Sequence, residues 1–166
     1  VFGEAAVPAL IELLEWKDWR PYPKIIAAGH LGRLLASNAV PALVATAGHR
    51  DPLVRIAAFD ALSGIGASHE SAAGAVADVL VTGLGDPDGP ARYAAARGLA
   101  PLASALAPTR EPVTLKLLDL AADRSPMVAR AARDLLAGLN VEEDVMLHDE
   151  RLYGEQRRDP VVADLK

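Results

Sequence analysis

The chain has 166 residues, of which 51% are hydrophobic and only 4% aromatic, so it can bury a sizeable core built from small and aliphatic side chains. It contains no cysteine, which excludes disulfides, thiol nucleophiles and cysteine-ligated metals. The net charge of −5 is concentrated in residues 140–166, which hold eight acidic and four basic residues. Residues 1–139 are nearly neutral and lack the basic excess typical of nucleic-acid-binding proteins.

The sequence also predicts where the protein resides. No run approaches the roughly 18 apolar residues of a membrane-spanning helix. The first residues lack the basic and apolar regions of a signal peptide. We therefore expect a cytoplasmic protein that does not enter a membrane. The chain begins with Val1, which is compatible with processing or with a piece of a larger chain or complex.

Two kinds of helical segment alternate along the chain. The first kind, called B, is amphipathic and nearly identical in AVPALIELL (6–14) and AVPALVATA (39–47). We expect B helices at residues 4–15, 38–48, 70–83 and 111–122. The second kind, called A, follows an aspartate and a proline and runs through small residues to leucines. We expect A helices at residues 22–35, 52–65, 90–104 and 126–138, and no stretch has the alternating pattern of a β-strand.

The A segments align as a repeat. One aligned position holds the leucines Leu31, Leu62, Leu99 and Leu136, which recur after 31, 37 and 37 residues, a period typical of solenoids. Another aliphatic residue follows three positions later on the same helix face, so both fill the core. The preceding aspartates are expected to cap the helices; they are Asp18, Asp51, Asp86 and Asp123. The glycines Gly64, Gly66 and Gly138 suit helix ends.

The segment DPLVRIAAFDALSGIG (51–66) shows the repeat most clearly. Its order of Asp-Pro, Val-Arg, Ala-Ala, Ala-Leu and a glycine-containing turn resembles the HEAT repeat, most closely the bacterial phycobilisome-lyase HEAT-like type. The resemblance covers residues 4–139 and implies an all-α fold, an α-solenoid of stacked antiparallel helix pairs. We expect an array over residues 1–139 with a half unit at 4–16, units at 17–50, 51–85 and 86–122, and a half unit at 123–139. The acidic tail, residues 140–166, has a segment that could form a short capping helix.

The sequence contains no convincing catalytic, cofactor-binding or metal-binding pattern. Ser63 lies in ALSGIG, but Ala61 stands where a nucleophile elbow needs its first glycine. The four histidines are dispersed. His148 lies among acidic residues of the tail, where solvated charge is favoured over a metal site. We therefore predict no catalytic residues, no metal and no cofactor.

A basic residue recurs at one position of the A segments, as Lys24, Arg55 and Arg92. HEAT-like repeats pair such a residue with an acidic residue of a neighbouring unit. The resemblance therefore implies a stabilising ladder of these bases with the repeated aspartates. A phosphate-binding stripe is the alternative, and the balancing acids disfavour it.

The one aromatic cluster is Trp16, Trp19 and Tyr22, in EWKDWRPYP. These side chains either pack against the first repeat or stay exposed as an anchor for a partner, because Trp and Tyr are enriched at interface hot spots. The B helices of such solenoids typically line the concave side. The positions expected to be exposed there are Ala9, Ala42, Asp78 and Lys116, then Glu12, Ala45, Val81 and Asp119. The candidate partner contacts are Trp16, Trp19, Tyr22, Glu12, Asp78, Lys116 and Asp119.

Three functions follow from these patterns. The first is a scaffold or binding module that contacts a protein partner through the curved surface and catalyses nothing. The second, implied by the family resemblance, is an accessory lyase or chaperone acting on a partner protein or its cofactor. The third, a nucleic-acid-binding or DNA-repair protein of HEAT-like fold, is disfavoured by the neutral body.

Overall fold

The computed structural model describes residues 3–17 and 20–139, and these form helices without any strand. The α-helices are α1 (Val7–Glu15), α2 (Pro21–Arg33), α3 (Val40–Thr46), α4 (Pro52–Ser68), α5 (Glu70–Gly83), α6 (Gly89–Leu99), α7 (Arg110–Leu120) and α8 (Pro126–Gly138). Short 3-10 segments, Glu4–Ala6 and Ser37–Ala39, precede α1 and α3, and a longer one, Ala100–Thr109, joins α6 to α7. The predicted helix at 90–104 is wrong at its end, because Pro101 has no N–H to continue the α-helical ladder.

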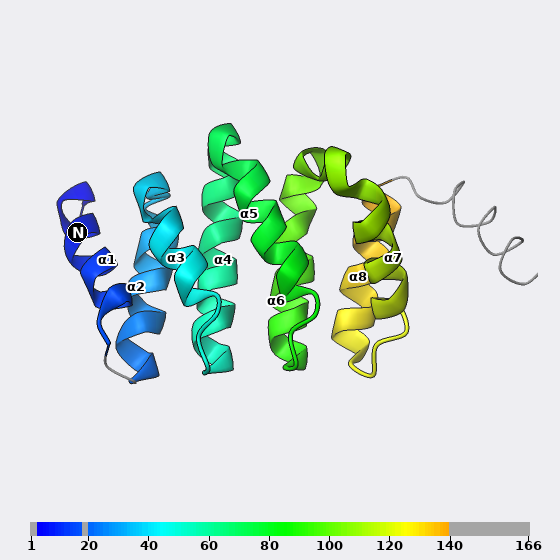
Figure 1. Ribbon diagram of the computed structural model, residues 1–166, viewed down its shortest axis with the longest axis horizontal. Helices are drawn as coiled ribbons and strands as arrows, with labels where there is room; N and C mark the ends of the chain where they lie inside the picture. The colour runs from blue at the N-terminus through cyan, green and yellow to red at the C-terminus, as the bar shows by residue number, and fades with distance from the viewer. Residues whose placement is uncertain (1–2, 18–19, 140–166) are drawn as a thin grey trace, which may run out of the picture.

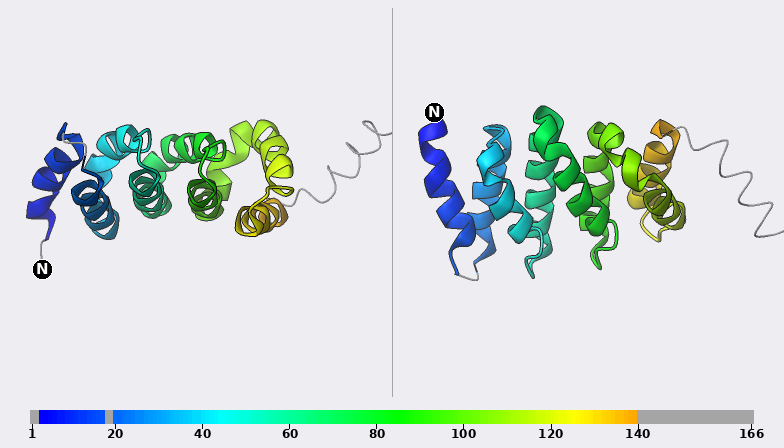
Figure 2. Two further views of the ribbon diagram at one scale, coloured as in Figure 1. Left: turned by 90° about the horizontal axis from the view of Figure 1, so that it is seen from below. Right: turned by 45° about the horizontal axis from the view of Figure 1, so that its top comes forward.

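The helices stack side by side into an elongated solenoid (Figure 1). Figure 2 shows α2, α4, α6 and α8 in one row and α3, α5 and α7 in a second row. Each helix of the first row packs against the next helix of that row, and both α3 and α5 lie against α4. The predicted fold class, an all-α solenoid, is therefore confirmed. The division into units at 17–50, 51–85 and 86–122 stays a prediction.

The repeated leucines form the core. Leu31, Leu62 and Leu99 of the first row are fully buried, and Leu136 of α8 is partly buried against the same core. In the second row, the fully buried leucines are Leu43, Leu80 and Leu117. Each follows the previous one by 37 residues, the spacing that separates Leu62 from Leu99. The sequence period is thus a period of burial, with one leucine from each helix filling the space between the rows.

Small residues allow the helices of the first row to approach closely. A methyl group added at Gly32 would lie 2.8 Å from the Ala61 Cα, which leaves no room for it. At the next junction, Ser63 Oγ donates a hydrogen bond to the Gly98 carbonyl oxygen at 2.9 Å. Ser63 therefore has a structural role. Gly66 also has a structural role, because a methyl group added there would lie 3.1 Å from Val76 of α5. It lies inside α4 and not at a helix end as predicted. Gly64, in the same helix, likewise lies before its end.

The helix caps agree with the sequence prediction at one aspartate. Asp51 precedes α4, and its Oδ1 accepts a hydrogen bond from the Leu53 N–H at 2.9 Å. At α6 the cap is Asp88, which accepts from the Ala91 N–H at 3.0 Å. Both carboxylates satisfy N–H groups that have no partner within the helix.

The capping prediction is wrong for Asp86 and Asp123. Each lies two residues before the helix cap and accepts a hydrogen bond from the N–H two positions later, that of Asp88 and of Ser125. This turn directs both carboxylates toward an arginine of the preceding unit and away from their own helix. Asp18 lies outside the described residues.

We expect Leu62→Ala to lower the free energy of unfolding by about 2–5 kcal/mol, the range for truncating a buried leucine. Leu53→Ala is the matched control, because Leu53 lies on the same helix but is 59% exposed. Chemical denaturation of both variants measures the difference. Equal losses would mean that the core face of α4 is assigned wrongly.

Gly32→Ala and Gly29→Ala test the close approach of α2 and α4. At Gly29 an added methyl would have no neighbour within 4 Å, so alanine is expected to stabilise by up to about 1 kcal/mol through its helix propensity. At Gly32 the collision with Ala61 should instead destabilise by about 1–3 kcal/mol. Thermal unfolding of the two variants should shift in opposite directions.

Candidate interaction surface

Two arginines of the first row join successive units. Arg55 of α4 donates from Nε and Nη2 to the two carboxylate oxygens of Asp86, at 2.7 and 2.6 Å. Arg92 of α6 binds Asp123 in the same way, at 2.8 and 3.1 Å. Both ion pairs are largely shielded from solvent. Such bidentate pairs combine charge attraction with fixed geometry.

The same arginines also hold their own loops. Arg55 Nη1 donates to the carbonyl oxygen of His49 at 2.9 Å, and Arg92 Nη1 donates to that of Asp86 at 2.8 Å. Each guanidinium thus connects the loop before its own helix to the loop before the next helix of the row. The predicted ladder is confirmed for these two arginines. Because their donors are used within the chain, a phosphate-binding stripe has no support here.

The pairing favours the charged forms of its members. The hydrogen bond from Arg92 is the main cause that lowers the pKa of Asp123. Burial alone would raise the pKa of Asp86, but hydrogen bonds from Arg55 and from the Asp88 N–H outweigh it, so that this pKa is also lowered. The carboxylates therefore stay ionised, and they serve stability.

Lys24, the remaining basic residue of the predicted ladder, binds main-chain carbonyls. It is buried, and its Nζ donates to the carbonyl oxygen of Leu14 and, at 2.7 Å, to that of Trp16. These carbonyls lie at the carboxyl end of α1, where a positive charge is favourable. Lys24 therefore fixes the end of α1 to α2, and with it the backbone of Trp16.

The lowered carboxylate pKa values predict acid sensitivity. The stabilisation that the ion pairs of Asp86 and Asp123 provide is fully present above a pH of about 3.9, the pKa of aspartate in the unfolded chain. This stabilisation is lost as the pH falls through the lower pKa values that Asp86 and Asp123 have in the folded chain.

At pH 7, Arg55→Gln should lower the free energy of unfolding by about 2–3 kcal/mol, because the Asp86 carboxylate keeps its shielded charge without its partner. The variant should also lose less stability than the wild type between pH 5 and pH 2.

Arg130→Gln is the control for this experiment. Its Nε lies 3.8 Å from Asp134 Oδ2 in an exposed pair of α8, which should contribute about 0–1 kcal/mol. Urea unfolding over a pH series measures both variants. A pH profile of Arg55→Gln parallel to that of the wild type would contradict the assigned role.

Trp16 and Tyr22 are exposed, with 60% and 71% of their surface accessible. For these two side chains the structure therefore favours exposure over packing against the first repeat. Trp19 lies outside the described residues. The backbone of Trp16 is held at two points, since its N–H donates to the Glu12 carbonyl oxygen at 2.9 Å and its own carbonyl accepts from Lys24. An exposed tryptophan thus projects from a fixed backbone.

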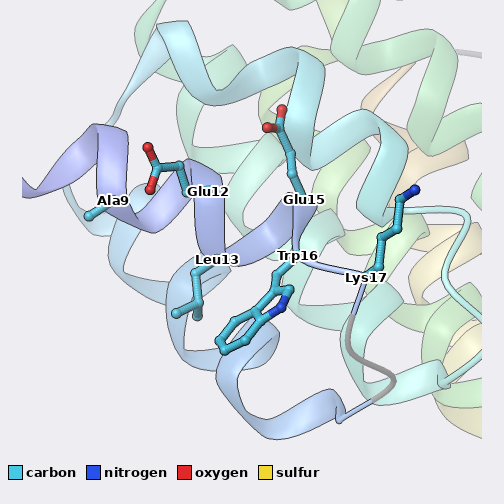
Figure 3. A pocket seen from close by; sticks show the side chains of 6 residues that line it. All are labelled: Ala9, Glu12, Leu13, Glu15, Trp16 and Lys17. Atoms are coloured by element: carbon cyan, nitrogen blue, oxygen red, sulfur yellow. The ribbon is translucent and has the colours of Figure 1, made fainter.

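A shallow groove on α1 borders this tryptophan (Figure 3). Figure 3 shows Leu13 and Trp16 pointing to one side of the helix, while the carboxylates of Glu12 and Glu15 point to the other. The groove is lined by Ala9, Glu12, Leu13, Glu15, Trp16 and Lys17. It combines an apolar strip with an acidic edge at one end of the solenoid.

The other predicted contacts are dispersed along the second row. Asp78 of α5 and Asp119 of α7 are exposed, and Glu12 is exposed on α1. Lys116 is half-buried, and its Nζ donates to the Val81 carbonyl oxygen at 2.9 Å, which ties α7 to α5. The structure therefore brings together Glu12 and Trp16 in the groove on α1 and places Tyr22 near the start of the next helix, α2.

One of the predicted exposed positions is wrong. Ala42 is buried in α3, because it lies next to the core residue Leu43 on the helix surface that faces the rest of the array. The buried leucines also correct the alignment of α5. Since Leu80 is equivalent to Leu43, the residue equivalent to Ala42 is Val79 and not Asp78.

Other kinds of site find no support in residues 3–17 and 20–139. No group of three acidic, histidine or cysteine side chains in these segments could hold a metal ion. No helix within them is long and apolar enough to cross a membrane. The acidic cluster around His148 lies outside the described residues.

Comparison with known proteins bears on the whole array. A family model of HEAT repeats matches residues 7–100, more than half of the chain. The chain belongs to the HEAT-repeat family. This HEAT chain is also similar in fold to two crystal structures of engineered proteins from the Northeast Structural Genomics Consortium. The first has a TM-score of 0.67 and 23% identity, and the second 0.65 and 25%. In each case the match covers 80% of the HEAT chain and 62% of the engineered protein.

Among curated proteins, no relative matches the HEAT chain. The finer resemblance to the phycobilisome-lyase type stays a prediction. Sequence reasoning missed the groove on α1 and the 40% exposure of Ile26 on α2.

Proposed function

We propose that this HEAT chain is a scaffold or binding module that recognises another protein and has no catalytic step of its own. The observation that carries the proposal is Trp16, a large aromatic side chain that is mostly exposed while its backbone is fixed by hydrogen bonds to Glu12 and from Lys24. An anchor held in place before binding loses less conformational freedom when the partner arrives. Tyr22, also exposed and near the start of α2, and Trp19 belong to the same proposal.

The charges of the surface favour a protein over a nucleic acid. Residues 1–139 contain fourteen acidic and thirteen basic residues, and the paired arginines Arg55 and Arg92 bind aspartates within the array. Glu12 and Glu15 lie beside the apolar strip and would repel phosphate groups. A protein segment with an apolar side chain for Trp16 and a basic one for the glutamates fits this surface. A cytoplasmic location is part of the proposal, as are contacts at the exposed Asp78 and Asp119 and at the half-buried Lys116.

The test compares Trp16→Ala with Leu53→Ala. Both remove an exposed apolar side chain, but Leu53 lies on α4, away from the groove. A binding partner is first identified by capture with the wild-type chain and is then purified. Trp16→Ala should weaken its affinity by about tenfold or more, as expected when a hot-spot residue is truncated.

Leu53→Ala should leave that affinity unchanged, and circular dichroism should show both variants folded. Unchanged affinity of Trp16→Ala would remove Trp16 as the anchor. Tight DNA binding that weakens steeply with salt would overturn the choice of a protein partner.

A further inference from the structure

A second groove lies between α6 and α8, far along the array from α1 (Figure 1). Tyr93 and Arg97 line it on the α6 side, and residues from Met127 to Leu135 line it on the α8 side. The α8 residues recur at helical spacing, so they form one continuous stripe along that helix. Met127 is 59% exposed and Tyr93 is half-buried. The groove therefore presents apolar side chains to the solvent.

Two arginines of this groove are held only by exposed contacts. Arg97 binds Asp60 of α4, and its guanidinium carbon lies 5.9 Å from the centre of the Tyr93 ring. Arg130 Nε lies 3.8 Å from Asp134 Oδ2. Both ion pairs are open to solvent, unlike those of the ladder. Exposed pairs contribute about 0–1 kcal/mol, so these two guanidinium groups can bind a further carboxylate at little cost.

The two helices that form the groove carry an excess of positive charge. Together α6 and α8 contain four arginines and one acidic residue, Asp134. Of the four, Arg92 is paired with Asp123 in the ladder. The second row has the opposite balance at α5, which contains Glu70 and Asp78 and no basic residue. The near neutrality of residues 1–139 thus conceals a positive surface on α6 and α8.

The segment that follows α8 has the complementary character. Residues 141–150, VEEDVMLHDE, contain five acidic residues and no lysine or arginine. Three consecutive apolar residues, Val145, Met146 and Leu147, stand between the two acidic groups. The segment lies outside the described residues. Its composition offers carboxylates for the arginines and apolar side chains for the rest of the groove.

The groove is within reach of this segment. Its Leu135 end lies one helical turn before Leu139. Met127, at the other end, precedes Leu139 by roughly 18 Å along the helix, at about 1.5 Å per residue. An extended chain covers roughly 3.3 Å per residue, so the stretch from Leu139 to Met146 can span roughly 23 Å. Met146 can therefore reach Met127.

We propose that residues 141–150 bind in the groove between α6 and α8. Their three apolar residues pack on Tyr93 and Met127, and their carboxylates bind Arg97 and Arg130. The covalent connection to α8 holds the segment at an effective concentration in about the millimolar range, so contacts that are individually weak suffice. The bound segment closes the groove to acidic segments of other proteins. This inference is independent of the surface at Trp16.

Disulfide trapping tests the proposal, because the chain contains no cysteine of its own. The full chain receives Met127→Cys and Met146→Cys. The control pair is Arg133→Cys with Met146→Cys. Arg133 is exposed on α8 and donates to the Ala121 carbonyl oxygen, outside the groove. It is also closer than Met127 to Met146 along the chain, so an unbound segment would favour the control pair.

Non-reducing electrophoresis in a glutathione buffer measures the two rates. The intramolecular disulfide of the Met127 pair should form at least about tenfold faster than that of the Arg133 pair, because binding raises the effective concentration at the groove alone.

A charge swap separates binding from proximity. Arg97→Glu with Arg130→Glu should slow the Met127 pair to the rate of the control. Adding Glu142→Arg and Glu143→Arg to the same chain should restore the faster rate, since opposite charges then meet again. Circular dichroism checks that each variant is folded, and restoration of the rate would exclude misfolding as the cause of the loss.

Equal rates for the two cysteine pairs would overturn the proposal, as would a Met127 pair that ignores the arginine substitutions. A disulfide that forms between two chains and not within one would assign the groove to the segment of a second copy, and would also overturn it. None of these variants alters Trp16, so either result leaves the proposed function to its own test.

Discussion

The arginine that joins one loop to the next is the interaction on which the array depends. In a solenoid each helix pair contacts only its neighbours, so every junction must be held by local contacts. Arg55 and Arg92 do this with one planar guanidinium each, which binds an aspartate of the following unit with two nitrogens and a carbonyl of its own loop with a third. These contacts set the spacing of successive loops, and the core leucines then pack at a regular distance.

Matched side-chain sizes complete each junction. Gly32 admits Ala61 in the first row, and Gly83 admits Phe59 where α5 crosses α4. A close-packed interior allows neither a void nor a collision, so the size of one residue fixes that of the residue opposite.

The proposed function rests on exposed side chains that do not take part in the packing of the repeats. The recurring arginines and aspartates are used to hold the junctions, and Ser63 and Lys116 each bind a carbonyl of a neighbouring helix. These groups therefore explain the fold and need no further role. Trp16, at the end of α1, and Tyr22, near the start of α2, are different, because they are large, apolar and exposed. The proposed binding surface uses these exposed side chains, which the packing of the repeats does not require.

The sequence by itself determined the class of fold and its period, because leucines that recur after 31, 37 and 37 residues on successive helices indicate helices buried by stacking. It also predicted the cap at Asp51, which depends on a recognisable helix start, while the resemblance to HEAT repeats implied the ladder at Arg55 and Arg92. Only the tertiary structure decided that Asp86 and Asp123 do not cap their own helices and that Ala42 is buried. It also decided that Trp16 is open to solvent. The reason is that helical periodicity fixes which residues share a face, whereas the neighbours that cover that face come from contacts distant in the chain.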